Sequence, residues 1–397
     1  GSTAISEKEI IMAILTPISD PIASLIPTGP SWTLDWQAVD GAFDWIRDLK
    51  GCPQDPIHHA EGDVWIHTKM VCEELVALPE WRALPYQDQR VTFAAALLHD
   101  VSKPETTRID EVTGKISQPG HSRVGAIRAR GILWRMGWSM EERERVCALI
   151  VRHQIPFWLI EREAFDARRI LLAGSLSVSN RLLALLAEAD MRGRLARDKQ
   201  EILDRVDLFR EMAKDEACFD QPFAFPDDHT RYTYFRDPSG RQPSYPAFDD
   251  TRCEVTVMAG LPGAGKSTWI SEHGEGRPVV SLDVLRREMG VDPEDNQGTV
   301  IQAAKERAKE HLRQCKPFIW DATNLSRQIR GQCLDLFHDY KAKIHLVHVE
   351  APETLLRSGN RDRDARVPDA VIDRLISKWE MPDLTEAHIL DRVVRAK

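Results

Sequence analysis

The sequence has few cysteines and no long apolar run. Only seven cysteines occur in 397 residues, and no two of them form a C-x-x-C pair. Scattered cysteines in a chain of this length are typical of a reduced, cytoplasmic protein and not of a disulfide framework or a structural zinc site. Even the longest uninterrupted apolar runs, such as residues 93–98, are short. We therefore expect no segment that spans a bilayer and no membrane partner.

Neither sign of charge dominates the composition. Lys and Arg number 53 and Asp and Glu number 62, which gives a net charge of −9. A hydrophobic fraction of 42% and a charged fraction of 29% exclude a disordered chain, a collagen and a coiled-coil rod. The acidic balance argues against tight binding of nucleic acid over the whole surface, but it leaves room for a local basic groove.

The two halves of the chain carry different patterns. Between about 60 and 215 the apolar residues recur at helical spacing. The stretch 219–251 is rich in proline, aspartate and aromatic residues and has no period, which predicts a linker that packs on a neighbour. We therefore expect an all-α domain over 1–218 and a second domain over 252–397. A helix over 34–49 is expected to cap the helical bundle.

From residue 253 onwards, apolar strands alternate with helices. This alternation predicts an α/β domain whose parallel sheet is covered on both faces. The expected strands are 254–259, 278–282, 318–321 and 344–350, and the expected helices are 266–273, 297–314, 326–338 and 368–379.

A phosphate-binding loop follows the first of these strands. Residues 260–267 read Gly-Leu-Pro-Gly-Ala-Gly-Lys-Ser and fit the pattern G-x-x-x-x-G-K-[ST]. Glycines let backbone N–H groups converge on phosphate oxygens, and the helix N-terminus adds positive charge. We expect Lys266 to reach the β- and γ-phosphates of ATP or another NTP and the Ser267 hydroxyl to bind Mg²⁺. The expected nucleotide contacts are Gly260, Gly263, Ala264, Gly265, Lys266, Ser267 and Thr268.

Three later segments place polar residues where the nucleotide would lie. Asp283 follows the second strand and could take a proton from an attacking hydroxyl, although aspartate there also favours a helix N-cap. Asp321 ends the third strand and is placed to order Mg²⁺ or its waters. Arginines in 361–368 could neutralise charge on the transferring phosphoryl group or form a solvated turn.

The ordered set GLPGAGKST, SLDVLR, DATN and RDRDARVP resembles the phage-type polynucleotide 5′-hydroxyl kinases over about 253–397. The resemblance implies that Asp283 is the general base for the substrate 5′-OH and that Arg286 holds the neighbouring phosphate of the acceptor. It also implies that a lid arginine, Arg363 or Arg366, grips the donor phosphates. Gln297 falls where that family often has a polar residue near the phosphates.

In the helical half, histidine and aspartate stand at the ends of apolar segments. His99 and Asp100 close the run 93–98, and buried polar groups of this kind need a partner. His67 shares a face with nearby valines, and Asp190 ends another apolar helix. Imidazole together with carboxylate suits zinc or a first-row transition metal. Taken singly, each histidine is more often hydrogen-bonded or exposed than a ligand.

As a set, the order H…HD…H…H…D over about 55–215 resembles the HD-domain phosphohydrolases, an all-helical superfamily of metal phosphoesterases. The phrase Leu-Leu-His-Asp-Val-Ser-Lys-Pro at 97–104 carries most of the likeness. The resemblance implies that Lys103 contacts the substrate phosphate. It implies a first metal held by His67, His99, Asp100 and Asp190 and, in dinuclear members, a second held by His121 and His153. His58 and His59 precede this set; His59 could join the site, but we prefer to interpret the two as a surface pair.

Basic residues gather near the expected metal site. Seven arginines and three glutamates lie between His121 and His153, which suits a phosphodiester chain or a solvated helix face. An HD phosphohydrolase placed ahead of a polynucleotide kinase resembles the bacterial bifunctional end-healing proteins. The resemblance implies phosphorylation of 5′-OH ends and removal of a 2′,3′-cyclic phosphate or a 3′-phosphate. Its partners would be RNA or DNA ends and a polynucleotide ligase.

Three other functions fit the same motifs. The kinase half could phosphorylate a small alcohol while the HD half acts on nucleotides. The helical half could hold an oxygen-activating di-iron site. The chain could also be a non-catalytic, nucleotide-switched binding module, although the complete ligand set and Asp283 argue against this function.

Overall fold

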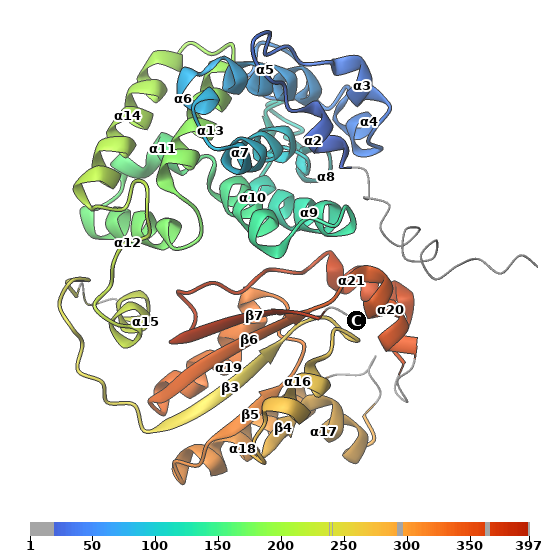
Figure 1. The fold of residues 1–397 in the computed structure, drawn as a ribbon, viewed down its shortest axis with the longest axis vertical. Helices are drawn as coiled ribbons and strands as arrows, with labels where there is room; N and C mark the ends of the chain where they lie inside the picture. Colours follow the sequence, from blue (N-terminus) through green and yellow to red (C-terminus); the bar gives the residue numbers. More distant parts are fainter. Residues whose placement is uncertain (1–19, 238, 240, 292–296, 362–365, 396–397) are drawn as a thin grey trace, which may run out of the picture.

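The computed structural model describes residues 20–237, 239, 241–291, 297–361 and 366–395. A helical N-terminal half lies above a C-terminal half built on a β-sheet in the view of Figure 1. The expected sequence of an all-α region followed by an α/β region with a parallel sheet is confirmed.

The N-terminal half consists of helices and one short hairpin. Its elements are α2 (Pro21–Leu25), α3 (Trp36–Asp40), α4 (Trp45–Leu49), α5 (Val64–Ala77), α6 (Pro79–Arg82), α7 (Tyr86–Leu98), α8 (Lys103–Thr106), β1 (Arg108–Ile109), β2 (Ile116–Ser117), α9 (His121–Arg135), α10 (Met140–Arg152), α11 (Ile155–Trp158), η1 (Leu159–Glu161), α12 (Ala164–Ser175), α13 (Asn180–Arg192) and α14 (Lys199–Asp215). The helix α7 packs against α5, α10 and α13, and α9 packs along α10. The buried apolar side chains of these helices form one core.

Two short helices, α3 and α4, replace the single helix expected over 34–49. The first ends at Gly41, whose N–H bonds to the carbonyl of Val39. Glycine destabilises a helix interior by about 1 kcal/mol relative to alanine, so ending the helix at this residue loses little helix stability. The second helix then buries Trp45 and Ile46 in the core. Burial of these side chains therefore sets the direction of α4.

Side-chain caps fix where two of the site-bearing helices begin. The Asp63 carboxylate accepts the N–H of Ile66 at 2.8 Å and so caps α5. Ser139 caps α10 by accepting the N–H of Glu142, and its hydroxyl donates to the Glu142 carboxylate. Each cap satisfies a backbone N–H group that has no partner within its helix.

The C-terminal half alternates strands and helices around a five-stranded sheet. Its elements are β3 (Cys253–Ala259), α16 (Lys266–His273), β4 (Val279–Ser281), α17 (Leu282–Glu288), α18 (Gly298–Arg313), β5 (Phe318–Asp321), α19 (Arg327–Asp339), β6 (Ala342–Glu350), α20 (Glu353–Arg361), α21 (Asp369–Ile376) and β7 (Ile389–Val394). The strand order is β4-β5-β3-β6-β7, and every paired strand is parallel. The carboxyl ends of all five strands therefore lie at one edge of the sheet.

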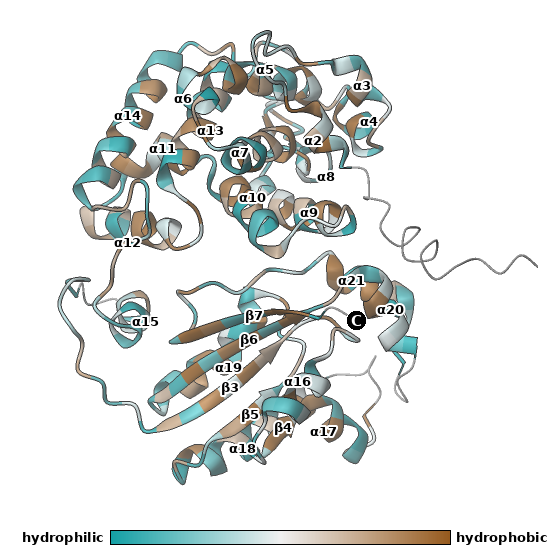
Figure 2. Ribbon diagram, viewed as in Figure 1, coloured by the Kyte–Doolittle hydropathy of each residue, from teal (hydrophilic) through white to brown (hydrophobic). Residues whose placement is uncertain are grey.

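Alternate residues of the central strand β3 face opposite layers. Val255 and Val257 pack with α18 and α19, whereas Met258 packs with α16 on the other face. Most residues of β3 and β6 are buried, and Figure 2 shows brown apolar segments along both strands between hydrophilic positions such as Glu254 and Lys343. This packing holds the carboxyl ends of the strands, and the loops that follow them, in fixed positions.

The stretch 219–251 contains a helix, α15 (Asp228–Arg236), that the sequence did not predict. Its Tyr232 is buried in the core of the sheet, whereas Phe225 and Phe235 pack against the core of the helical half. The helix lies beside the sheet, at the left of Figure 1. The aromatic residues of this stretch thus contact both halves, and the domain limits at 218 and 252 stay a prediction.

No single helix of the described ranges has the length and hydropathy needed to cross a membrane. The pair α12 and α13 passes this test only together, with a bend of 105° between the two helices. Most side chains of α13 are buried within the protein.

Candidate active sites

Four histidines and two aspartates from five parts of the helical half meet in one buried cluster. They lie on α5, directly after α7, at the first turn of α9, directly after α10 and in the last turn of α13. All six side chains are buried. Their ligand atoms form two groups, within each of which all atoms lie within 4.8 Å of one another, and the groups are His67, His99 and Asp190, and Asp100, His121 and His153. The structure thus brings together all six residues of the helical half that were expected to hold metal.

The carboxylate of Asp100 lies between the two groups. Its Oδ2 is 3.1 Å from His99 Nε2 and 3.7 Å from His67 Nε2, and its Oδ1 is 3.6 Å from His121 Nε2. On the far side of His67, the same Nε2 is 3.1 Å from Asp190 Oδ1. A carboxylate in this position can contact two adjacent ions.

Backbone carbonyls set the orientation of three of the rings. Each ring places Nδ1 against the carbonyl three residues earlier, at 2.8 Å for His99, 2.8 Å for His121 and 2.7 Å for His153. The fourth ring, that of His67, has Nδ1 2.9 Å from Glu61 Oε1. A proton on Nδ1 leaves the Nε2 lone pair directed into the cluster, which is the tautomer that binds metal.

The cluster fits a divalent metal. Among the described residues, Nε2 of His67, His99 and His153 and both carboxylate oxygens of Asp100 are buried without a hydrogen bond of good geometry. A buried polar atom that lacks a good hydrogen bond costs about 1–3 kcal/mol, and one or two ions would satisfy several of these atoms at once. Imidazole nitrogens and carboxylate oxygens are donors that zinc and first-row transition metals accept.

At four of the cluster residues, burial and charge favour the protonation state that binds metal. Burial acts to raise the pKa of Asp100, but the neighbouring cations hold it well below its usual range, and the pKa of Asp190 is likewise lowered. Burial lowers the pKa of His153 to about 3 and also lowers that of His121. His99 differs, because Asp100 outweighs burial and raises its pKa. Both carboxylates are therefore ionised, and two of the rings are neutral, at pH 7.

The lysine expected to contact phosphate lies at the edge of the cluster. Lys103 is 3% exposed, and its Nζ lies 2.8 Å from Asp100 Oδ2. It also donates to Gln54 Oε1 at 2.6 Å. The ammonium group is thus held beside the carboxylate that separates the two groups of ligands.

Two residues beside the cluster, Arg194 and His59, differ from what the sequence led us to expect. Arg194 donates to both carboxylate oxygens of Asp190, at 2.9 and 2.7 Å, and the spacing of four residues was an available signal. His59 was expected at the surface with His58, but it is buried, with Nδ1 2.8 Å from Glu61 Oε1. The contact with the Glu61 carboxylate keeps the His59 ring buried. The loop that carries both residues has no periodic pattern from which this contact could be predicted. His58 is exposed as expected.

The phosphate-binding loop joins β3 to α16, as expected. Gly260, Gly263 and Gly265 have φ values of +144°, +82° and +107°. A Cβ at Gly260 would lie 2.2 Å from the carbonyl oxygen of Val349, so the close approach of β6 also requires glycine. Lys266 Nζ donates to two carbonyls of the loop, at 2.9 and 3.2 Å. Ala264 is buried beneath the loop, and Ser267 and Thr268 are exposed at the start of α16.

The predicted catalytic and acceptor-binding residues of the kinase half contact one another. Arg286 Nη1 donates to Asp283 Oδ1 at 2.6 Å, and Arg286 Nε donates to Gln297 Oε1 at 2.7 Å. Ser281, and not Asp283, occupies the N-cap position of α17, so the capping role considered for Asp283 is not observed. Asp321 Oδ2 accepts the hydroxyl of Ser281 at 3.0 Å, which ties together the ends of β4 and β5.

The lid arginines are only partly described. Arg363 lies outside the described residues. Arg366 is exposed, and its Nη2 is 3.6 Å from Asp369 Oδ2. A further arginine, Arg395, lies against the phosphate-binding loop, because a Cβ at Gly265 would be 3.0 Å from its Cδ. It follows β7, a strand that the sequence did not predict, so no motif pointed to it.

Comparison with known proteins places a different family model on each half. Residues 64–189 match the HD domain, and residues 255–382 match a model described as an AAA domain. The chain is 32% identical to the CC-adding tRNA nucleotidyltransferase of Thermus thermophilus (42% of this chain, 35% of the relative). It is 23% identical to the L-seryl-tRNA(Sec) kinase of Methanococcus maripaludis (33% and 58%) and 25% identical to the bifunctional polynucleotide phosphatase/kinase of Schizosaccharomyces pombe (34% and 31%).

Each of these relatives is matched over less than two thirds of its own length. The two family models cover separate ranges, one within the helical half and one that includes every strand of the five-stranded sheet except the start of β3 and all of β7. The chain therefore joins an HD domain in its N-terminal region to a P-loop, kinase-like domain in its C-terminal region.

Proposed function

We propose that this protein heals nucleic-acid ends. The P-loop domain would phosphorylate the 5′-OH of an RNA or DNA strand, and the HD domain would remove a 2′,3′-cyclic phosphate or a 3′-phosphate. The products, a 5′-phosphate and a 3′-OH, are the ends that a polynucleotide ligase joins. The observation that carries this proposal is the presence, in one chain, of a phosphate-binding loop with an Asp-Arg-Gln set and a buried cluster of six potential metal ligands.

The relatives support a nucleic-acid substrate. Their names refer to tRNA or to polynucleotides, and one of them is a bifunctional phosphatase/kinase. A P-loop and a metal cluster both serve phosphate chemistry. A shared substrate for the two sites is therefore the simplest reason for their fusion.

In the kinase reaction, Asp283 would accept the proton of the 5′-hydroxyl as its oxygen bonds to the γ-phosphorus. The bond from that phosphorus to the bridging oxygen breaks, and the nucleoside diphosphate leaves. Arg286, already bonded to Asp283, would hold the acceptor phosphate next to the reacting hydroxyl. Lys266, Ser267 with Mg²⁺, and a lid arginine (Arg363 or Arg366) would hold the donor phosphates, and Asp321 would order the ion or its waters.

In the HD domain, the two ligand groups would hold one or two divalent ions, with Asp100 among the ligands. A bound ion supplies positive charge that polarises phosphoryl oxygens and acidifies water. Arg194 and Glu61 orient the side chains of Asp190 and His67. Lys103 would give up its hydrogen bond to Gln54 and donate to a substrate phosphate oxygen instead. Its ammonium group lies close enough to the cluster to do so.

The kinase assignment predicts the effect of Asp283→Asn. Loss of a general base costs a factor of about 10²–10⁴ in rate, so transfer of labelled phosphate from ATP to a 5′-OH oligonucleotide should fall by that amount. Asp391→Asn, which changes an exposed carboxylate on β7, should keep the wild-type rate. Full activity in Asp283→Asn would remove this residue from the mechanism. Transfer to small alcohols in preference to the oligonucleotide would replace the proposed substrate.

The HD assignment predicts the effect of His99→Ala. Metal content, measured on the purified protein, and release of 3′-phosphate or opening of a 2′,3′-cyclic phosphate should both fall, the activity by a factor of about 100 or more. Phosphorylation of 5′ ends should not change, because the P-loop lies in the other half. The matched control is His58→Ala, since His58 is close in sequence but exposed. Unchanged metal content in His99→Ala would contradict the assignment.

A further inference from the structure

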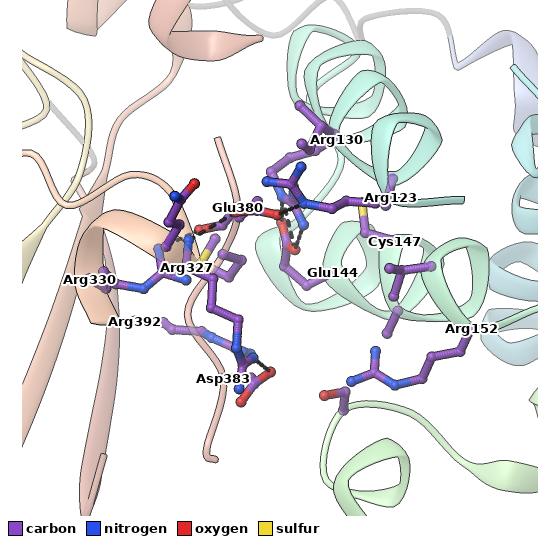
Figure 3. Close-up of a pocket in the computed structure, with 17 residues that line it drawn as sticks. Arg123, Arg130, Glu144, Cys147, Arg152, Arg327, Arg330, Glu380, Asp383 and Arg392 are labelled. Atoms are coloured by element: carbon purple, nitrogen blue, oxygen red, sulfur yellow. Dashed lines mark hydrogen bonds and ion pairs between the residues drawn. The ribbon is translucent and has the colours of Figure 1, made fainter. Parts of the chain in front are cut away.

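A cavity of about 580 Å³ lies between the two halves of the molecule. One wall comes from α9 and α10 of the helical half, and the other comes from α19, β7 and the segment that contains Glu380 and Asp383 (Figure 3). Pockets for small ligands have volumes of about 300–1,000 Å³, so this cavity has room for a nucleotide-sized group. Neither of the two candidate active sites contributes a residue to its lining.

Arginine is the most frequent residue type in this cavity. Three carboxylates also line it, namely Glu144, Glu380 and Asp383. The arginines are Arg123, Arg130, Arg152, Arg327, Arg330 and Arg392. The lining therefore carries an excess of positive charge.

Four of the six arginines have a carboxylate partner. Arg123 pairs with Glu380, and Arg130 pairs with Glu144 at 2.8 Å. On the other wall, Arg327 pairs with Asp383 and Arg330 pairs with Glu386, each at 2.7 Å. These guanidinium groups are neutralised within the protein and shape the walls of the cavity.

The two remaining arginines have no carboxylate within 4.0 Å in the described part of the chain. Arg152 makes no hydrogen bond or ion pair there, and in Figure 3 its guanidinium points towards Asp383 and Arg327 across the cavity. Arg392 donates to the carbonyl of Pro382 at 2.9 Å. Burial lowers the pKa of Arg392, and the charges of Glu144 and Asp383 act against this from beyond ion-pair distance. A guanidinium without a counter-ion in such a place is a site for an anion.

The two uncompensated arginines come from different halves of the molecule. Arg152 is the last residue of α10 and precedes the metal-cluster residue His153, and Arg392 lies on the edge strand β7. An anion held by both would lie against the HD domain and the P-loop domain together. A strand with several phosphates fits this arrangement, because one phosphate can lie near each of the two arginines.

We propose that this interdomain cavity binds phosphate groups of the single-stranded RNA or DNA whose ends the protein heals. The inference rests on the proposed function and adds a site outside both catalytic centres. Arg152 and Arg392 bind the backbone through charge-assisted hydrogen bonds, and the paired arginines keep the walls open. Such contacts hold a strand without reading its sequence.

Binding of a fluorescent 20-nucleotide strand to the full-length protein, followed by anisotropy at several salt concentrations, tests this site. Arg152→Gln and Arg392→Gln should each weaken binding about tenfold, as loss of a charge-assisted hydrogen bond requires. The double variant should lower the slope of log K against log salt by about 1.4, since each single-strand phosphate contact contributes about 0.7. Arg47→Gln and Arg307→Gln remove the same charge from exposed helix surfaces and should bind as the wild type does.

A variant of an exposed cavity residue separates loss of binding from misfolding. Gln328 lines the cavity and is exposed, so Gln328→Glu adds a negative charge there without disturbing a buried contact, and it should also weaken binding. Equal affinity and equal salt slope in the cavity variants and the controls would overturn the inference. Displacement of the strand from wild type by millimolar inorganic phosphate or AMP as effectively as by unlabelled strand would assign the cavity to a small anion instead. Phosphorylation of 5′-OH ends and removal of 3′-phosphate or cyclic phosphate are also measured on the wild type. Loss of these activities would contradict the proposed function, whereas unchanged strand affinity in the cavity variants would contradict only the cavity site.

Discussion

At the scale of single residues, the histidines of the metal cluster obtain their orientation from the ends of helices. His99 and His153 are the C-cap residues of α7 and α10, where backbone carbonyls lack an intrahelical partner. Their Nδ1 atoms take up two of these carbonyls, and their Nε2 atoms are then fixed towards the cluster. One hydrogen bond thus completes the helix end and prepares the ligand.

A buried histidine outside the two sites predicts how stability depends on pH. His388 is 2% exposed, accepts the N–H of Ile344 at 3.0 Å, and lies 3.2 Å from His229 Nδ1. Burial and the neighbouring cations lower its pKa to about 3, although Asp249 acts against this. The unfolded chain takes up a proton near pH 6.5, so His388 contributes its full stability above that pH and loses it as the pH falls towards 3.

Urea unfolding at pH 7.5 and pH 5.0 measures this contribution. The wild type should lose about 2 kcal/mol from His388 between these values, because 1.5 pH units lie below the unfolded pKa. In His388→Asn the loss between the two pH values should be smaller by that amount. The other histidines titrate in both proteins and cancel in the comparison. An identical pH dependence in the variant would show that His388 is not the group responsible.

At the scale of elements, the metal cluster depends on how closely α13 approaches α5. Gly193 follows α13, and a Cβ there would lie 2.8 Å from the backbone nitrogen of Val71 on α5. The φ value at Gly193 is −72°, so packing and not backbone conformation demands glycine. This contact holds Asp190 of α13 within 3.1 Å of His67 of α5.

Gly193→Ala should therefore destabilise the protein by about 1–3 kcal/mol, the usual cost of overpacking, and should weaken metal binding at the same time. Denaturant unfolding and a metal titration measure the two effects. Gly41→Ala is the control, since nothing lies within 4 Å of the position of its Cβ. If the metal affinity of Gly193→Ala matched that of the control, the contact between the helices would have no role in shaping the cluster.

Several elements followed from the sequence and others did not. The helix Lys266–His273 and the strand Phe318–Asp321 have the predicted limits, because apolar periodicity and flanking glycine or proline mark them locally. Strand β7 was missed, since Asp391 and Arg392 interrupt its apolar pattern. It forms because its backbone pairs with β6, which is a long-range contact.

At the scale of the whole molecule, a buried ionic network joins the two halves. Arg143 of α10 is fully buried and contacts Glu144 at 2.8 Å and both carboxylate oxygens of Glu350 on β6 at 3.0 and 2.7 Å. Next to it, Trp134 of α9 donates to the carbonyl of Ala351 at 3.1 Å and packs in an apolar cluster with Leu261 of the phosphate-binding loop. The helical half is thus fixed directly to the end of the sheet that carries the nucleotide loop.

Glu350→Gln should weaken this joint. Removal of one charge from a buried pair costs about 3–5 kcal/mol, because the remaining guanidinium stays buried without full compensation. We expect calorimetry to show two unfolding transitions in the variant where the wild type shows one. Glu353→Gln removes a partly exposed partner of Arg135 at the same interface and should cost no more than about 1 kcal/mol. A single, unshifted transition in Glu350→Gln would show that the network does not couple the halves.

The sequence by itself determined the phosphate-binding loop, the change from helices to an alternating α/β pattern, and the six residues of the metal cluster. These depend on neighbours in the chain, such as the strand and helix that flank the loop, and on residue types whose chemistry allows few uses. Only the tertiary structure decided that Asp100 lies between two groups of ligands, that His59 is buried against Glu61, and that two uncompensated arginines face one cavity between the halves. Such contacts join residues far apart in the chain, so packing and charge compensation in the folded protein set them, and no local pattern records them.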